Sequence, residues 1–237
     1  DITIHHRTEE FEAIFKNTRE LLIEIYDMPE VVILASSGTG AMEACVTNLT
    51  HKKALTINSG KFGERFGKIC AAFGIDYTEI KNEWNTPVSV EAVVEAIKAD
   101  SSIDAVFIQI CESAGGLRHP VEQIAAEVKK INKDITIVAD GITAIGVEKI
   151  DTTNLDAVIT GSQKALMLPP GLAMIGLSTA AVAKIESKPK GYYFNLATEI
   201  KKQRTNTTAW TAATTLIIGL GAILEKLKAD GFDNLYK

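Results

Sequence analysis

Short runs of apolar, often β-branched residues alternate along this chain with stretches whose apolar residues recur at helical spacing. The alternation is typical of strand–helix–strand units, which build a parallel sheet covered by helices on both faces. Four of the runs are apolar nearly throughout, as expected for strands that are buried on both faces. We therefore predict an α/β fold with a mostly parallel seven-stranded sheet. The predicted strands are Val31–Ala35, Lys53–Ile57, Tyr77–Lys81, Ile103–Ile110, Ile135–Asp140, Asp156–Thr160 and Leu172–Ser178.

The stretch Lys188–Thr208 has the least regular pattern, and we expect a long connection or an exposed binding loop there. Its aromatic cluster, Tyr192-Tyr193-Phe194, favours local packing or an interface over a ligand site. The rest of the chain between the strands has helical periodicity. The predicted helices are Glu9–Tyr26, Gly40–Asn48, Lys61–Phe73, Val90–Ala99, Val121–Ile131, Ala180–Ser187 and Thr211–Ala229.

Composition excludes several classes of partner. The net charge of −5 carries no basic block, so we do not expect nucleic acid to bind. No apolar run approaches the roughly 20 residues that a membrane span needs. The three cysteines, Cys45, Cys70 and Cys111, are far apart and odd in number, which suits neither a disulfide framework nor a metal site and favours a reducing cytoplasm. At 237 residues the chain forms one large domain or two small ones.

The segment Ser36-Ser37-Gly38-Thr39-Gly40 joins an apolar strand to a predicted helix. Glycines allow close approach of the backbone, hydroxyls donate hydrogen bonds, and the free amides of a helix N-terminus attract an anion. The plainer interpretation is a small-residue turn with a Ser/Thr cap. The segment lacks the third glycine of G-x-G-x-x-G and the GK[ST] of a P-loop, so a nucleotide fits it poorly.

Two further residues come at strand ends, where open α/β sheets bind ligands. Asp140 ends the run 135–139, and Lys164 follows the strand 156–160 through a Gly/Ser turn. Alone, Asp140 could cap a helix or bind a metal, and Lys164 could be an ordinary surface lysine. Together with the candidate anion site at Ser36–Gly40, they match what pyridoxal phosphate requires: a phosphate site, a partner for the ring nitrogen and a reactive amine. The four histidines form no zinc motif, and no G-x-S-x-G elbow is present.

With these residues in view, the chain resembles the class V aminotransferases, which are fold-type I pyridoxal-phosphate enzymes, and within them the serine–pyruvate/alanine–glyoxylate branch. The run Thr160–Leu166 followed by Pro169-Pro170-Gly171 is similar to the family's lysine signature. The run Ala139–Ile142 is similar to its aspartate strand. Supporting stretches are Ser36–Glu43, Asn58–Arg65, Glu112-Ser113 and His6-Arg7 with Glu10-Phe11.

The resemblance implies a role for each matching residue. Lys164 would hold the cofactor as a Schiff base and move the proton of the substrate's Cα atom. Asp140 would pair with the pyridine nitrogen and keep it protonated. The implied contacts are Phe62 and Ile142 on the two ring faces, Ser113 near the phenolic oxygen, and Gly38, Thr39 and Gln163 at the phosphate.

Thr208-Ala209-Trp210-Thr211-Ala212 resembles the family's T-P-[YF]-T-P segment, whose second threonine binds the phosphate of a neighbouring subunit. The resemblance therefore implies a homodimer in which Thr211 belongs to the cofactor site. Both prolines of the family pattern are alanine here, which leaves the rigidity of this segment open.

The implied function is transfer of an amino group from serine or alanine to a 2-oxo acid such as glyoxylate or pyruvate. The alternatives are transamination of 2-aminoethylphosphonate or another class V transaminase or lyase reaction, and a non-catalytic remnant that binds or dimerises. Residues 1–237 are expected to be the cofactor-binding large domain, without the small C-terminal domain of the family.

Overall fold

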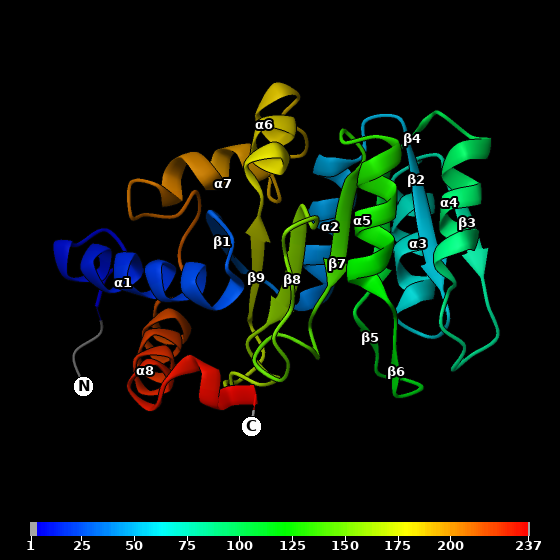
Figure 1. Ribbon diagram of the computed structural model, residues 1–237. Coiled ribbons are helices and arrows are strands. Elements are labelled where there is room, and N and C mark those ends of the chain that lie inside the picture. Colours follow the sequence, from blue (N-terminus) through cyan, green and yellow to red (C-terminus); the bar gives the residue numbers. More distant parts are fainter. Residues whose placement is uncertain (1–3, 237) are drawn as a thin grey trace.

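The computed structural model describes residues 4–236, so residues 1–3 and Lys237 of the predicted domain lie outside the described residues. Seven strands form one sheet in the order β1-β9-β8-β7-β4-β2-β3 (Figure 1). Neighbouring strands are parallel except β9, which is antiparallel to both β1 and β8. The predicted mostly parallel α/β sheet is confirmed. The strands are β1 (Glu30–Ala35), β2 (Lys53–Asn58), β3 (Tyr77–Lys81), β4 (Ile103–Gln109), β7 (Thr136–Asp140), β8 (Ala157–Gly161) and β9 (Leu172–Leu177).

Helices cover both faces of this sheet, with α4 and α5 in front and α2 and α3 behind in Figure 1. Two apolar clusters lie between the helices and the sheet, one on each face. Burial on both faces explains why most strands read as continuous apolar runs. The helices are α1 (Glu9–Tyr26), α2 (Gly38–Leu49), α3 (Gly63–Ala72), α4 (Val90–Ala99), α5 (Val121–Ile131), α6 (Thr179–Ser187), α7 (Leu196–Gln203) and α8 (Thr214–Asp230), with a final 3-10 turn, η1 (Phe232–Tyr236).

Two features differ from the sequence prediction. The expectation of an irregular stretch over Lys188–Thr208 is wrong at α7, where Asn195 caps the helix by accepting from the Thr198 N–H at 2.9 Å. A small antiparallel ribbon, β5 (Cys111–Glu112) with β6 (Leu117–Arg118), also forms after β4 and extends beyond the sheet (Figure 1). Both elements are short, and tertiary contacts rather than periodicity define them.

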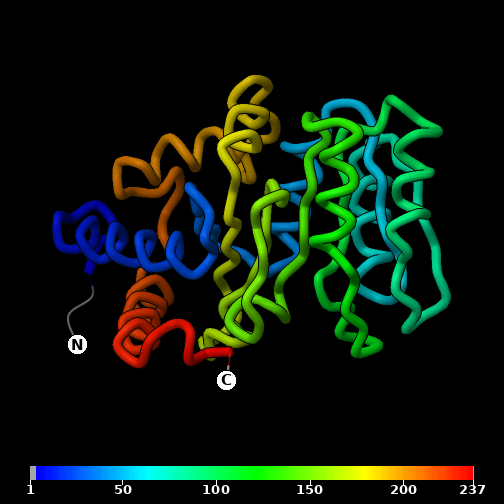
Figure 2. The backbone as a smooth tube through the Cα atoms, in the orientation of Figure 1, coloured from blue at the N-terminus to red at the C-terminus, as the bar shows by residue number. Residues whose placement is uncertain are grey.

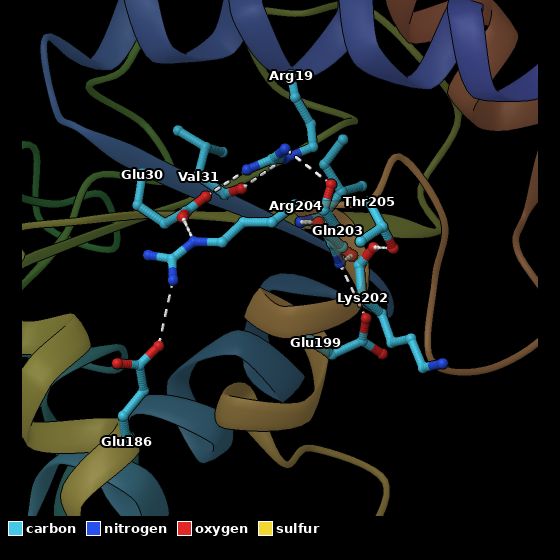
Figure 3. Close-up of polar contacts among 10 residues, drawn as sticks. Arg19, Glu30, Val31, Glu186, Glu199, Lys202, Gln203, Arg204 and Thr205 are labelled. Carbon is cyan, nitrogen blue, oxygen red and sulfur yellow. Dashed lines mark hydrogen bonds and ion pairs between the residues drawn. The ribbon is translucent and has the colours of Figure 1, made fainter.

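The edge strand β1 is covered by side chains of α7 and α1, among them Gln203 and Arg19 (Figure 3). Gln203 pairs with Ile33 as another strand would: its Nε2 donates to the Ile33 carbonyl at 2.7 Å, and its Oε1 accepts from the Ile33 N–H at 2.9 Å. Arg19 of α1 donates to the Glu30 carboxylate and to the Gln203 carbonyl. Arg204 binds the same carboxylate at 2.8 Å. The backbone of an edge strand is thereby satisfied instead of being open to another chain.

The carboxyl ends of the central strands lie at one edge of the sheet. Gln109 of β4 is in register with Asp140 of β7, which is in register with Ile159 of β8. Beyond this edge lie the turn after β8, the β5–β6 ribbon and the start of α2. Figure 2 shows the chain between α7 and α8 running beside β1. Within residues 4–236, no helix combines the length and the apolar character needed to span a membrane.

Candidate functional site

A pocket at the carboxyl edge brings together eight of the nine residues predicted for the site. These eight come from the start of α2, the segments at the ends of β7 and β8, the N-cap of α3 and the β5–β6 ribbon. Thr211 is not among the lining residues. The pocket is lined by Ser37, Gly38, Thr39, Phe62, Arg65, Cys111, Ser113, Asp140, Ile142, Thr143, Gln163 and Lys164.

One end of the pocket is the N-terminus of α2. The helix begins at Gly38, two residues earlier than predicted, so Gly38 and Thr39 lie in its first turn, where N–H groups have no intrahelical acceptor. The side chain of Ser37 makes no capping hydrogen bond. A Cβ atom on Gly38 would lie 2.4 Å from Cδ1 of Ile142, so a larger residue here would have to displace that side chain. This end of the pocket therefore offers backbone N–H groups to an anion.

Arg65 of α3 adds a cation to the same end, and the sequence analysis did not single it out as a site residue. Its Nη1 donates to Oγ1 of Thr39 at 2.8 Å, and its guanidinium carbon lies 4.9 Å from the centre of the Phe62 ring. Among residues 4–236, no carboxylate forms an ion pair with Arg65. Arg65 lies three positions after Phe62, one helical turn along α3, and this spacing is the signal that could have indicated it.

Asp140 is a buried acid at the end of β7, with 5% of its surface exposed. Its Oδ1 accepts from the N–H of Ile142 at 3.0 Å, and no ion pair to its carboxylate occurs within the described chain. The pKa of Asp140 is raised to about 6, mainly by burial and also by nearby Glu112, against the lowering effects of the Ile142 N–H bond and of the charges of Arg65 and Lys164. Such a carboxylate is suited to a ligand that presents a cationic N–H group to it.

Lys164 lies in the turn after β8, and its side chain is exposed toward the pocket and free of ion pairs with residues 4–236. Ser162 holds this turn, because its hydroxyl donates to the carbonyl of Pro169 at 2.7 Å and accepts from the N–H of Leu172 at 3.2 Å. The neighbouring Gln163 has a buried Oε1 atom without a hydrogen-bond partner in the described structure. The turn therefore supplies the free amine of Lys164 and the carboxamide of Gln163, whose oxygen accepts no hydrogen bond from the described residues.

The remaining walls are apolar or weakly polar. Phe62 is the N-cap residue of α3, Ile142 follows β7, and Ser113 follows β5. An anion end, a buried acid, an amine and a pocket lined by the side chains of Phe62 and Ile142 together match the functional groups of pyridoxal phosphate. The uncapped start of α2 with Arg65 beside it, and the buried Asp140 carboxyl without a cationic partner among the described residues, are the observations on which this fit is judged.

Thr211 lies in a different pocket, next to β1 and on the connection before α8. Its neighbours there include Tyr193, Glu199 and Trp210. The Trp210 ring stacks on Tyr193 with centroids 5.9 Å apart, and its Nε1 donates to the Tyr193 carbonyl at 3.0 Å. Within one chain, Thr211 does not line the pocket that holds Lys164 and Asp140.

Aminotransferases are among the proteins that this chain resembles in family, in sequence and in structure. The family model described as aminotransferase class-V matches residues 2–237. An uncharacterized aminotransferase of Helicobacter pylori is 49% identical over 234 residues, covering 98% of this chain and 63% of the relative. A serine–glyoxylate aminotransferase of Hyphomicrobium methylovorum is 30% identical over 215 residues, covering 87% of this chain and 53% of the relative.

A solved structure of similar shape is an aspartate aminotransferase of subgroup IV from Thermus thermophilus. It has a TM-score of 0.91 and 32% sequence identity, and the match covers 99% of this chain and 67% of that one. The chain spans 63% of the length of its relative from Helicobacter pylori and about half that of the serine–glyoxylate enzyme.

Proposed function

The chain belongs to the class-V aminotransferase family, and we propose that it binds pyridoxal phosphate and transfers an amino group from serine or alanine to glyoxylate or pyruvate. One observation carries the proposal: the pocket at the carboxyl edge combines the Lys164 amine, the buried Asp140 carboxyl and the uncapped start of α2. Residues 1–237 are proposed to form the cofactor-binding large domain.

In this proposal each end of the pocket recognises one part of the cofactor. The N–H groups of Gly38 and Thr39, with Gln163 and Arg65, would hold the phosphate. Asp140 would keep the ring nitrogen protonated, because its carboxylate otherwise has no cationic partner within the described residues. Phe62 and Ile142 would pack against the two ring faces, and Ser113 would hydrogen-bond near the phenolic oxygen.

The bound cofactor supplies an electron sink for the pair released when the substrate's Cα–H bond breaks. Lys164 would hold the cofactor and, once displaced by the substrate amine, take and return the Cα proton at its Nζ atom. Its exposure toward the pocket and the Ser162 hydrogen bonds that fix its turn support this role. Asp140 contributes by favouring the cationic ring, which withdraws electrons more strongly than the neutral one.

The choice of serine or alanine with glyoxylate or pyruvate is supported by the branch that the sequence motifs resemble and by the serine–glyoxylate relative. A homodimer is part of the proposal, with Thr211 acting at the phosphate of the neighbouring subunit. The support is that Thr211 lies outside its own chain's cofactor pocket, in a pocket that it shares with Tyr193, which is 48% exposed. The three free cysteines support a cytoplasmic location.

The test is the near-visible absorption spectrum of the purified protein with added pyridoxal phosphate, before and after serine or alanine. We expect a band that is lost in Lys164→Ala, remains in the control Lys61→Ala, and shifts when the amino donor is added. A wild-type protein that stays colourless refutes the proposal. A stable band that no donor shifts would favour a binding protein without turnover.

A further inference from the structure

Glu112 is a fully buried carboxylate that the proposed function leaves without a role. It ends strand β5 and has 0% of its surface exposed. Its Oε2 accepts from the N–H of Phe62 at 2.9 Å and from the N–H of Gly63 at 2.8 Å, and its Oε1 accepts from the N–H of Ala114 at 3.2 Å. No lysine, arginine or histidine of the described residues forms an ion pair with it. Its negative charge is therefore held by backbone N–H groups alone.

These three hydrogen bonds join two segments that are about 50 positions apart in the chain and that both line the pocket. Two of the bonds fix the backbone where α3 begins, at Phe62 and Gly63. The third fixes Ala114, the residue directly after Ser113. The Glu112 side chain also packs against Gly60, where an added Cβ would lie 2.7 Å from its Cδ atom. The Glu112 side chain thus fixes the backbone beside Phe62 relative to the backbone beside Ser113, on two walls of the same pocket.

The two helix N-termini at the pocket differ in whether a side chain caps them. Glu112 caps α3 with a carboxylate, while Ser37 leaves the N-terminus of α2 without a side-chain cap. A carboxylate at a helix N-terminus satisfies its N–H groups and neutralises its positive end. The anion-binding capacity of the pocket therefore lies in the N–H groups that begin α2 and in the Arg65 guanidinium, and not in the N–H groups of Phe62 and Gly63 that begin α3.

We propose that Glu112 is a positioning residue of the cofactor site: it fastens Phe62 and Ser113 at the spacing that the cofactor ring requires and closes α3 to anions. The proposal rests on the proposed function, because it concerns the residues that would contact pyridoxal phosphate. The proximity of the Glu112 charge to Asp140, whose pKa it raises, agrees with its place beside the ring.

The test compares Glu112→Gln, Glu112→Asp and the matched control Glu64→Gln in the 237-residue chain. Glu64 is a carboxylate in the first turn of the same helix, and it pairs with Lys68 at 2.8 Å instead of with the pocket backbone. Two readouts are needed: amide hydrogen exchange of the segments 60–66 and 111–116 without cofactor, and the affinity for pyridoxal phosphate from absorption titration.

We expect Glu112→Gln to speed exchange in both segments and to weaken pyridoxal phosphate binding by about tenfold or more, because an amide cannot accept all three N–H donors. Glu112→Asp should restore part of both properties, and Glu64→Gln should change neither. If exchange speeds up while affinity stays at the wild-type value, Glu112 only stabilises the fold and the proposal is overturned. Unchanged exchange overturns it as well.

Failure of the proposed function gives a different result. If the wild-type chain does not bind pyridoxal phosphate, the proposed function is refuted and the cofactor role of Glu112 falls with it. The exchange measurement then still decides whether Glu112 fastens the two segments. If Glu112→Gln does not fold, Glu112→Asp provides both readouts, since it keeps the charge and shortens the reach of the side chain.

Discussion

Replacing Asp140 by Asn should stabilise the cofactor-free protein at neutral pH. Burial raises the pKa of Asp140 from its ordinary value of 3.8 to about 6. Between these two values the folded chain binds the proton more tightly than the unfolded chain, so the free energy of unfolding falls as the pH rises. Above pH 6 the whole cost of an ionised buried carboxylate is present. The neutral amide introduced by Asp140→Asn carries no such cost, and its oxygen can still accept from the N–H of Ile142.

The magnitude follows from the two pKa values. Their difference, at about 1.4 kcal/mol for each pKa unit, gives about 3 kcal/mol at pH 7 and about 1 kcal/mol at pH 4.5. Urea denaturation of Asp140→Asn and wild type over this pH range, without cofactor, measures the difference directly. The control Asp134→Asn removes an exposed carboxylate just before the same strand, and its difference from wild type should not follow this profile.

Two results would refute this reasoning. One is a difference between Asp140→Asn and wild type that stays constant from pH 4.5 to pH 7. The other is an Asp140→Asn protein that is less stable than wild type at pH 7. With pyridoxal phosphate present the order should reverse, because only the wild-type carboxylate can pair with a protonated ring nitrogen, and ligand binding then stabilises the wild type more.

Three further predictions concern the pocket and the edge strand. Arg65→Gln should weaken pyridoxal phosphate binding by about tenfold while leaving the affinity for unphosphorylated pyridoxal unchanged in parallel titrations; equal losses for both ligands would contradict its phosphate role. Gly38→Ala should push against Ile142, destabilise the protein by about 1–3 kcal/mol in urea and reduce cofactor binding; a neutral result would contradict the tight approach. Gln203→Ala should leave the N–H and carbonyl of Ile33 unpaired and cost about 2 kcal/mol in the same assay, with no change expected for the exposed control Lys202→Ala.

The sheet could be predicted from the sequence because most of its strands are buried on both faces and have a strong apolar signal. The ends of all seven strands, including the partly exposed β3, were found within one residue. The helix α7 was missed for a physical reason. It has eight residues, and part of its burial comes from polar contacts that Glu199 and Gln203 make with each other and with β1. Periodicity of apolar residues does not detect an element held in this way.

The same distinction separates the site residues that were predicted from those that were not. Asp140 and Lys164 follow strands, and the carboxyl ends of parallel strands share an edge, so their meeting could be inferred from the order of elements. Arg65 and Glu112 act across elements, through one hydrogen bond to Thr39 and three to the backbone of residues 62, 63 and 114. Such contacts depend on side-chain direction, which a single sequence does not specify.

The charges of the pocket bear on whether it is a working site or a remnant. Asp140 is buried and Arg65 is half-buried, yet within the described chain neither forms an ion pair, with the other or with any other residue. The ionised Asp140 carboxylate therefore lowers the stability of the cofactor-free protein at neutral pH, and substitution to a neutral residue would relieve that cost. A ligand with an anion at one end and a cationic N–H at the other would satisfy both at once. A fold that only dimerises has no use for two opposite charges held apart, so this arrangement favours a pocket that binds such a ligand.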